Sequence, residues 1–142
     1  IIAGVFYGFS TFIMRALADL PAAHGIAAMQ RINVVVLNPL FLMVFIGAAV
    51  LPAIASLLYY VAANTWAAAW LLGAAIAYTV GCFQVTMRFN VPKNSRLAQL
   101  EAGTPEAAAY WPIYVKEWLL WNHVRTAASA VASACSVVAL LP

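Results

Sequence analysis

Charged residues are scarce in this chain. Only 8% of its 142 residues are Asp, Glu, Lys or Arg, whereas 66% are hydrophobic. Soluble domains carry about 25% charged residues, and a water-soluble fold of this length cannot bury so large an apolar fraction. The composition therefore predicts an integral membrane protein with a single transmembrane domain over residues 1–142.

Signatures of metal, cofactor and nucleic-acid chemistry are also missing. There is no Gly-rich phosphate loop, nucleophile elbow or nucleic-acid-binding module. Cys82 and Cys135 form neither a CxxC nor a metal pattern, and His24 and His123 form no HxxxH pair. We expect no metal, no cofactor and no nucleic-acid partner. We also expect two free thiols that lie near opposite faces of the membrane.

Four apolar segments are long enough, with their flanks, to cross a bilayer, which takes roughly 20 residues. The expected spans are about 1–20, 26–61, 65–88 and 112–141. Pro39, Pro52 and Pro112 should kink or restart the second and fourth helices. The predicted fold is all-α: an integral membrane four-helix bundle whose kinked helices two and four extend on the charged side.

Two helix starts are marked by their residue types. Asn38 is placed to cap a helix that restarts at Pro39. Thr104 and Pro105 combine a capping hydroxyl with a proline at the first helical position, followed by the carboxylate of Glu106. Between the second and third spans, residues 62–65 form a tight, uncharged turn.

The charge distribution predicts the topology. All seven Lys and Arg residues and all four Asp and Glu residues fall within 15–31 and 88–125. In a four-span bundle, the connections 15–31 and 88–111 share one membrane face. The positive-inside rule places these two connections in the cytoplasm, in a multi-pass protein of the cell inner (plasma) membrane.

Polar side chains inside the spans indicate either a binding site or a packing network, because isolated polar groups are costly in a bilayer. They occur where helices one and three end and where helices two and four begin. We expect them to line a polar and aromatic pocket for a hydrophobic small molecule in the charged half of the bundle. The expected lining residues are Ser10, Met14, Gln30, Asn33, Gln84, Trp118, Trp121, Asn122 and Arg125.

Structural roles for the same residues are also compatible with the sequence. Trp118 and Trp121 are typical of an interfacial aromatic belt, and Arg125 is long enough to reach lipid headgroups. The GxxxG pattern of Gly4 and Gly8 favours helix packing within the bundle over a dimer contact.

Several segments resemble the anthrone oxygenase-like family of small four-helix membrane proteins, most of whose bacterial members have no assigned function. The matching segments are Gly4-Val5-Phe6-Tyr7-Gly8-Phe9-Ser10 with Met14, Ala27-Ala28-Met29-Gln30-Arg31-Ile32-Asn33 with Asn38-Pro39, Asn90-Val91-Pro92-Lys93-Asn94, and Trp118-Leu119-Leu120-Trp121-Asn122-His123-Val124-Arg125-Thr126. The last two segments are the most specific. Arg15 departs from the pattern, since family members often carry proline after the methionine.

The resemblance implies oxidation of a polycyclic anthrone to an anthraquinone by molecular oxygen, without metal or flavin. A general base would remove an acidic substrate proton, and the resulting anion would reduce oxygen directly. His123 or Glu117 would be the base. Arg125, Asn122 and Gln30 would stabilise the anion while the tryptophans stack on the flat rings.

A non-catalytic role is the alternative. The chain would then be a membrane module that binds lipid or a quinone-like ligand, or an accessory subunit of a larger membrane complex or homo-oligomer. A pocket lined by Trp118, Trp121 and Arg125 would favour the oxygenase, whereas their exposure to lipid or to a partner would favour the module. A small transporter is disfavoured because no span carries a central carboxylate.

Overall fold

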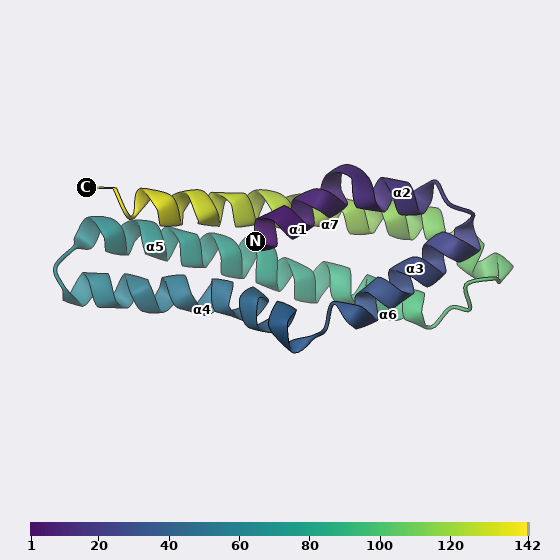
Figure 1. Cartoon of the computed structure of the whole chain (residues 1–142), viewed down its shortest axis with the longest axis horizontal. Coiled ribbons are helices and arrows are strands. Elements are labelled where there is room, and N and C mark those ends of the chain that lie inside the picture. The colour runs from purple at the N-terminus through teal and green to yellow at the C-terminus, as the bar shows by residue number, and fades with distance from the viewer. Residues whose placement is uncertain (142) are drawn as a thin grey trace.

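The computed structural model describes residues 1–141 and is almost entirely helical (Figure 1). No strand occurs in this part of the chain, so the predicted all-α class is confirmed. Pro142, the last residue of the predicted domain, lies outside the described residues. The segments are α1 (Ile2–Gly8), η1 (Phe9–Ile13), α2 (Met14–Ala18), α3 (Ala22–Val35), α4 (Pro39–Val61), α5 (Thr65–Tyr78), η2 (Thr79–Gln84), η3 (Thr86–Asn90), α6 (Val91–Ala98) and α7 (Pro105–Val138).

Two long helices form the axis of the molecule. The first runs over Thr65–Ala98 and joins α5, the π-helical segments η2 and η3, and α6. The second is α7, which also has 34 residues. Figure 1 shows the two side by side over the length of the molecule. Helix α4 packs along one half of this pair, whereas α2 and α3 pack along the other.

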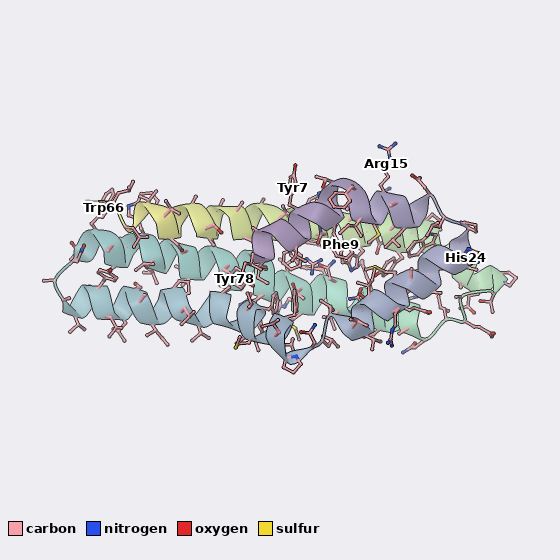
Figure 2. All side chains as sticks on the ribbon, in the orientation of Figure 1. Tyr7, Phe9, Arg15, His24, Trp66 and Tyr78 are labelled. Carbon is pink, nitrogen blue, oxygen red and sulfur yellow. The ribbon has the colours of Figure 1, made fainter. Side chains whose placement is uncertain are left out.

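Charge divides the molecule into two halves. Every charged residue belongs to α2, α3, η3, α6, the connections beside them or the first part of α7, which together form the charged half. The uncharged half consists of α4, α5 and the rest of α7. Figure 2 shows Arg15 and His24 towards one end of the molecule and Trp66 at the other.

Two helices are long and apolar enough to cross a membrane, α4 and the helix over Thr65–Ala98. The helix over Ile2–Ala18 is apolar but shorter. Only Phe45 and Ser56 are buried among the 23 residues of α4, so this helix exposes large apolar side chains along its length. The structure thus supports membrane spans for two of the four predicted helices and does not confirm the four-helix membrane bundle.

Capping side chains determine where three helices begin. The side-chain oxygens of Asn38, Asn64 and Thr104 accept a backbone N–H of the first turn at 3.0, 3.0 and 3.3 Å, respectively. Each satisfies a donor that has no partner within the helix. The predicted caps at Asn38 and Thr104 are confirmed. The turn before Asn64 contains Ala63 with φ 63°, which reverses the chain tightly between α4 and α5.

The charged half is more helical than the sequence predicts. The expected connection 15–31 is reduced to residues 19–21, and the expected connection 88–111 is reduced to 99–104. Two local causes explain the second correction. Pro92 lies in the first turn of α6, where the missing N–H removes no hydrogen bond within the helix. The Thr104 cap starts α7 at Pro105, seven residues before the predicted start at residue 112. The third helix therefore extends on the charged side together with the second and fourth.

The prolines in the apolar segments behave in two ways. Pro39 begins α4 after a break at residues 36–38, as predicted. Pro52 and Pro112 lie inside α4 and α7, and both helices continue through them.

The thiols of Cys82 and Cys135 are free, as predicted. Both pack in one apolar cluster between α1, α4, α5 and α7. Cys135 lies beside Gly73, nine residues before Cys82 on the same helix, which separates the two thiols by roughly 14 Å along the helix axis. The two thiols are therefore too far apart to form a disulfide, and their placement near opposite faces of the membrane stays a prediction.

Close helix contact occurs at a different glycine from those expected. Gly4 is exposed, and a Cβ there would meet no atom within 4 Å, so the Gly4 end of the GxxxG pattern makes no close contact. At Gly81, by contrast, a Cβ would lie 2.5 Å from the Cβ of Ala128. The two long helices therefore pack closely at Gly81, where η2 has no side chain.

We expect Gly81→Ala to destabilise the fold, because the added methyl group forces η2 and α7 apart. Overpacking costs about 1–3 kcal/mol, against about 1 kcal/mol that alanine gains in helix propensity. The matched control is Gly4→Ala, which has open space and should be neutral or slightly stabilising. Thermal unfolding in detergent measures both. A melting temperature for Gly81→Ala at or above that of Gly4→Ala would contradict the close approach.

Candidate functional site

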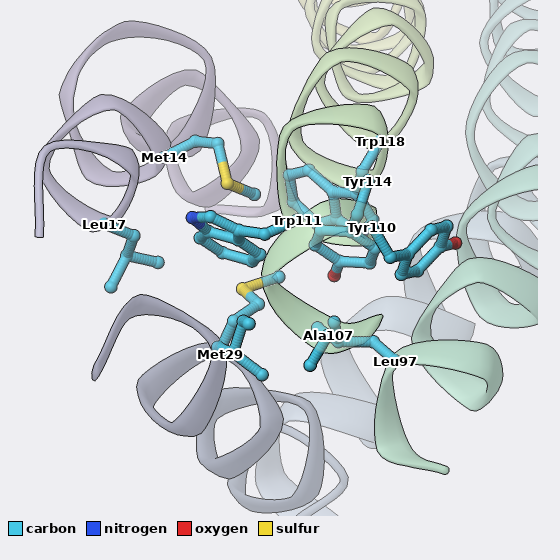
Figure 3. Close-up of a cluster of buried hydrophobic side chains, with 10 residues drawn as sticks. Met14, Leu17, Met29, Leu97, Ala107, Tyr110, Trp111, Tyr114 and Trp118 are labelled. Carbon is cyan, nitrogen blue, oxygen red and sulfur yellow. The ribbon is translucent and has the colours of Figure 1, made fainter. Parts of the chain in front are cut away.

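One stripe of α7 carries half of the buried polar and aromatic residues in the described chain. Its members recur every three, four or seven residues, which places them on one face of the helix. They are Trp111, Tyr114, Trp118, Asn122, Arg125 and Ser129. Figure 3 shows the aromatic part of this stripe, where Trp111 lies between Met14 and Met29.

Arg125 is the only charged residue on the stripe, and just 4% of its surface is exposed. Its guanidinium lies over the rings of Phe6 and Trp118, with its carbon 4.3 and 4.9 Å from their centroids. Nη2 donates to Asn122 Oδ1 at 2.7 Å, and Nη1 donates to Thr86 Oγ1 at 3.3 Å. Nε has no partner among the described residues. The cation is therefore held by neutral groups and aromatic faces.

No carboxylate neutralises Arg125 within residues 1–141. The ion pair in this part of the chain joins Lys93 to Glu117 at 3.2 Å, and the Glu117 side chain is half exposed. Transfer of a charge from water to the interior costs several kcal/mol of free energy, which only an oppositely charged partner in good geometry offsets. Arg125 therefore presents an interior positive charge that is still available to an anion.

Asn122 connects α7 to the first helix. Its Nδ2 donates to the backbone oxygen of Phe6 and to Ser10 Oγ, both at 2.8 Å. Ser10 Oγ in turn lies 2.9 Å from Thr126 Oγ1. The amide oxygen of Asn122 remains turned towards Arg125. This network holds η1 against α7 and fixes the position of the guanidinium.

The Asn-x-Pro-x-Asn motif holds Trp118 from two sides. Asn90 Nδ2 donates to the backbone oxygen of Trp118 at 3.1 Å. Asn94 Oδ1 accepts the indole N–H of Trp118 and the hydroxyl of Tyr114, both at 2.9 Å. Since Trp118 lies against Arg125, this motif positions the aromatic face that supports the cation.

Three π-helical segments surround the polar network. Ser10 belongs to η1, Cys82 to η2, and Thr86 and Asn90 to η3. A π turn contains an extra residue, so it widens the helix and turns the following side chains, and such turns occur frequently at functional sites. The widened turns bring Thr86 and Asn90 to face α7.

Buried polar atoms without a hydrogen-bond partner lie on the stripe or on residues beside it. Each costs about 1–3 kcal/mol when it stays unpaired, and such groups in a native structure call for an explanation, one of which is a ligand. These atoms are Asn33 Nδ2, Asn90 Oδ1, Trp111 Nε1, Arg125 Nε and Ser129 Oγ. Their concentration along one face of α7 marks this face as the candidate site.

Several predicted site residues meet in this arrangement. Ser10, Trp118, Asn122 and Arg125 form one network. Met14 is fully buried, and it packs in an aromatic cluster of the charged half. That cluster consists of Met14, Leu17, Ile26, Met29, Leu97, Ala107, Tyr110, Trp111, Tyr114 and Trp118. Asn33 is half-buried, and its amide nitrogen points inside without a partner.

Other predicted site residues lie outside the network. Gln30 Nε2 donates to the backbone oxygens of residues 97 and 100 at 2.8 Å, which fastens α3 to the end of α6. Trp121 is half-buried and stacks on Phe89 with centroids 3.6 Å apart. Gln84, His123 and Glu117 are exposed on the outer surface. The polar groups thus converge only in part.

The pocket that the sequence predicts in the charged half is not confirmed. Methionine and aromatic side chains fill the interior of the charged half. A groove of about 550 Å³ lies instead between α1, α4 and α7, and Tyr78 and Ser129 are among the residues that line it. Its lining carries no charged residue.

Asn90, Asn94, Tyr114 and Thr86 were missed as site residues by the sequence analysis. Asn90 and Asn94 had a signal in the sequence, since they are the two asparagines of the specific Asn-x-Pro-x-Asn motif. Tyr114 shares the helical stripe of Trp118 and had the same periodicity. Thr86 had no signal, because a threonine near the end of a span is common and its inward direction depends on the π turn.

A family model described as anthrone oxygenase matches residues 41–135, about two thirds of the chain. The match extends from the first turn of α4 into the last turn of α7, and it includes Asn90, Asn94, Asn122 and Arg125. It leaves out the first helix with Ser10. No curated protein and no solved structure matches the chain.

We expect Asn94→Ala to destabilise the protein by about 2–4 kcal/mol, because it leaves two buried donors without an acceptor at about 1–3 kcal/mol each. Ser95→Ala is the control, since Ser95 is exposed on the same helix and its hydroxyl donates only to the backbone oxygen of Val91 in that helix. Thermal unfolding in detergent measures the difference. Combining Asn94→Ala with Trp118→Phe should cost less than the two changes added together, and full additivity would show that the indole N–H does not depend on Asn94.

Proposed function

This chain belongs to the anthrone oxygenase family, and from that premise we propose that it is a membrane-embedded oxygenase for a flat, hydrophobic, phenolic substrate resembling an anthrone. The family supports an oxygenase-like function. The observation that supports this substrate class is the buried Arg125, whose charge no carboxylate of the described chain neutralises. Such a cation is suited to bind a substrate that becomes an anion during the reaction. An ionised phenol or enol of an aromatic ring system supplies such an anion.

We further propose that the helices form a four-span bundle in the inner membrane, with the charged half towards the cytoplasm. The apolar side chains that α4 exposes are suited to lipid. The restriction of charge to one half agrees with the positive-inside rule. Arg125 would then lie within the membrane, where an ionisable residue indicates a functional site.

The proposed reaction needs no further reductant. The substrate loses a proton from the ring carbon opposite its carbonyl, and the anion transfers electrons to molecular oxygen. One oxygen atom becomes the new carbonyl of the quinone, and the other leaves as water with the two hydrogens of that carbon. The carbon supplies every electron that the oxygen takes up. Arg125 and Asn122 would stabilise the anion, while Trp118 contacts its rings.

We expect Arg125→Met to lower kcat with an anthrone substrate by about 10²–10³-fold, the usual loss when a preorganised donor to a developing anion is removed. Arg125→Lys keeps the charge but loses the planar fork, and it should retain part of the rate. Exchange of a buried charge for an apolar side chain is often neutral for stability, so the variant should fold. Oxygen uptake by purified protein measures the rates.

The control is Arg88→Met, which removes an exposed arginine and should keep the wild-type rate. A wild-type rate in Arg125→Met, or no oxygen uptake by the wild-type protein, would refute the proposed role of Arg125.

His123 and Glu117 stay the candidate bases, although both are exposed. A base at either position would take the proton at the surface of the bundle. We expect either His123→Ala or Glu117→Gln to lower kcat by about 10²–10⁴-fold, the usual contribution of a general base. Oxygen uptake across a range of pH measures this. Wild-type rates in both variants would refute a catalytic role for His123 and Glu117.

A non-catalytic membrane module is the second candidate, and the exposure of both candidate bases favours it. Such a module would bind lipid or a quinone-like ligand, or it would join a larger complex or a homo-oligomer through the apolar face of α4. The presence of a bound chromophore in purified protein, together with the lack of oxygen uptake, would favour this candidate.

A further inference from the structure

The groove between α1, α4 and α7 has the features of a binding site for a small molecule. Its volume of about 550 Å³ lies in the range of roughly 300–1,000 Å³ that holds such ligands. Side chains of Ile2, Val44 and Leu51 supply apolar walls, and Gly47 leaves one wall without a side chain. The groove therefore offers a large apolar surface to an occupant.

Hydroxyl groups lie along the α7 wall of this groove, and one of them lacks a partner. Ser133 Oγ and Ser136 Oγ donate to backbone oxygens of their own helix at 2.9 Å. Tyr78 donates its hydroxyl to the backbone oxygen of Phe45 at 3.0 Å. Ser129, which also lines the groove, is only 2% exposed, and its Oγ has no hydrogen-bond partner within the described chain.

The surroundings of Ser129 Oγ favour a hydrogen bond from this hydroxyl to an oxygen atom of a ligand. The thiol of Cys82 lies beside it, but a thiol is only a weak hydrogen-bond group. An unpaired buried hydroxyl is costly, and a ligand oxygen that accepts its proton removes this cost. The groove thus combines apolar walls with a buried Ser129 hydroxyl on its α7 side that has only the weakly bonding thiol of Cys82 beside it.

We propose that this groove binds a flat, fused-ring molecule with a carbonyl or hydroxyl oxygen on its edge, and that this oxygen accepts a hydrogen bond from Ser129. The proposal rests on the proposed function, since the molecule is the substrate or product of that reaction. A lipid acyl chain fits the groove less well, because it carries no oxygen along its length to pair with Ser129. The observations therefore favour an oxygen-bearing ring system over a lipid tail.

The position of the groove suits a substrate that arrives through the membrane. Its α4 and α7 walls belong to the uncharged half, where no charged side chain bars access from lipid. Ser129 stands one helical turn from Arg125 on the same stripe of α7. A molecule held in the groove is thus one turn away from the cation that stabilises its anion.

Gly47→Leu tests the groove by filling it. A Cβ at Gly47 would meet only Leu51 Cδ1, at an ordinary 3.9 Å, so the helix accepts a side chain there. The matched control is Gly4→Leu, which adds the same side chain to a helical glycine in open space outside the groove. The probes are anthraquinone, bound to protein in lipid nanodiscs, and anthrone, used for turnover.

We expect Gly47→Leu to raise the Kd for anthraquinone and the KM for anthrone at least tenfold, with kcat nearly unchanged. Ser129→Ala should raise both constants about tenfold, the effect of one lost hydrogen bond, whereas Ser95→Ala, which removes an exposed hydroxyl on α6 outside the groove, should leave them unchanged. Gly4→Leu should match the wild type in every constant.

Two patterns of result separate this proposal from the proposed function. Unchanged Kd and KM in both Gly47→Leu and Ser129→Ala would overturn the groove, even if Arg125 proves essential for turnover. Anthraquinone binding that is lost in Gly47→Leu, in a protein without oxygen uptake, would keep the groove and refute the oxygenase. A shift of thermal stability with lipid chain length in Gly47→Leu, without any change in anthraquinone binding, would assign the groove to lipid and overturn the proposal.

Discussion

The structure around Arg125 is determined by the need to bury a cation without a carboxylate. A guanidinium has donors in a fixed plane and cannot lose its charge in a protein. The chain provides two aromatic faces, from Phe6 and Trp118, and two neutral acceptors, from Asn122 and Thr86. Each of these groups has to be held in place by others, and Asn90, Asn94 and Ser10 do so. The interior thus depends on hydrogen bonds between helices that meet at one level.

The two halves of the molecule differ in how their interior is packed and in whether a ligand can enter it. In the charged half, aromatic and methionine side chains fill the space between α2, α3, α6 and α7. In the uncharged half, small residues leave a groove whose buried Ser129 hydroxyl lies one turn from the buried cation. A dense, water-excluding interior strengthens the field of Arg125, whereas the groove provides the opening that such an interior lacks.

Much of the fold could be predicted because its signals are local. The caps at Asn38 and Thr104 depend on neighbouring residues in the chain, and the stripe of α7 depends on a helical period that stays regular. The inward direction of Ser10, Trp118, Asn122 and Arg125 was therefore predicted correctly. The same reasoning was wrong for Gln84, which is exposed. Gln84 ends a π-helical segment, and each π turn changes the helical phase that an ordinary wheel assumes.

The position of open space had no comparable signal in the sequence. Residue types predict that polar groups meet, but whether space remains between them depends on how Trp111, Tyr114 and Met29 pack against one another. The groove forms because Gly47 has no side chain and because the residues that α7 contributes are small. Small residues are common throughout this chain, so they do not indicate where a groove will lie. Close approach at Gly81 rather than Gly4 has the same origin.

The π-helical segments have one more consequence for the interior. A π turn contains one residue more than an α-helical turn, so the side chains that follow it point in a different direction from those of a regular helix. Segments η1, η2 and η3 carry Ser10, Cys82 and Thr86 at the level of the cation. The polar surroundings of Arg125 therefore depend on three local departures from the α-helical hydrogen-bond pattern, and a change that restored a regular α-helix at one of them would turn a polar side chain away from the cation.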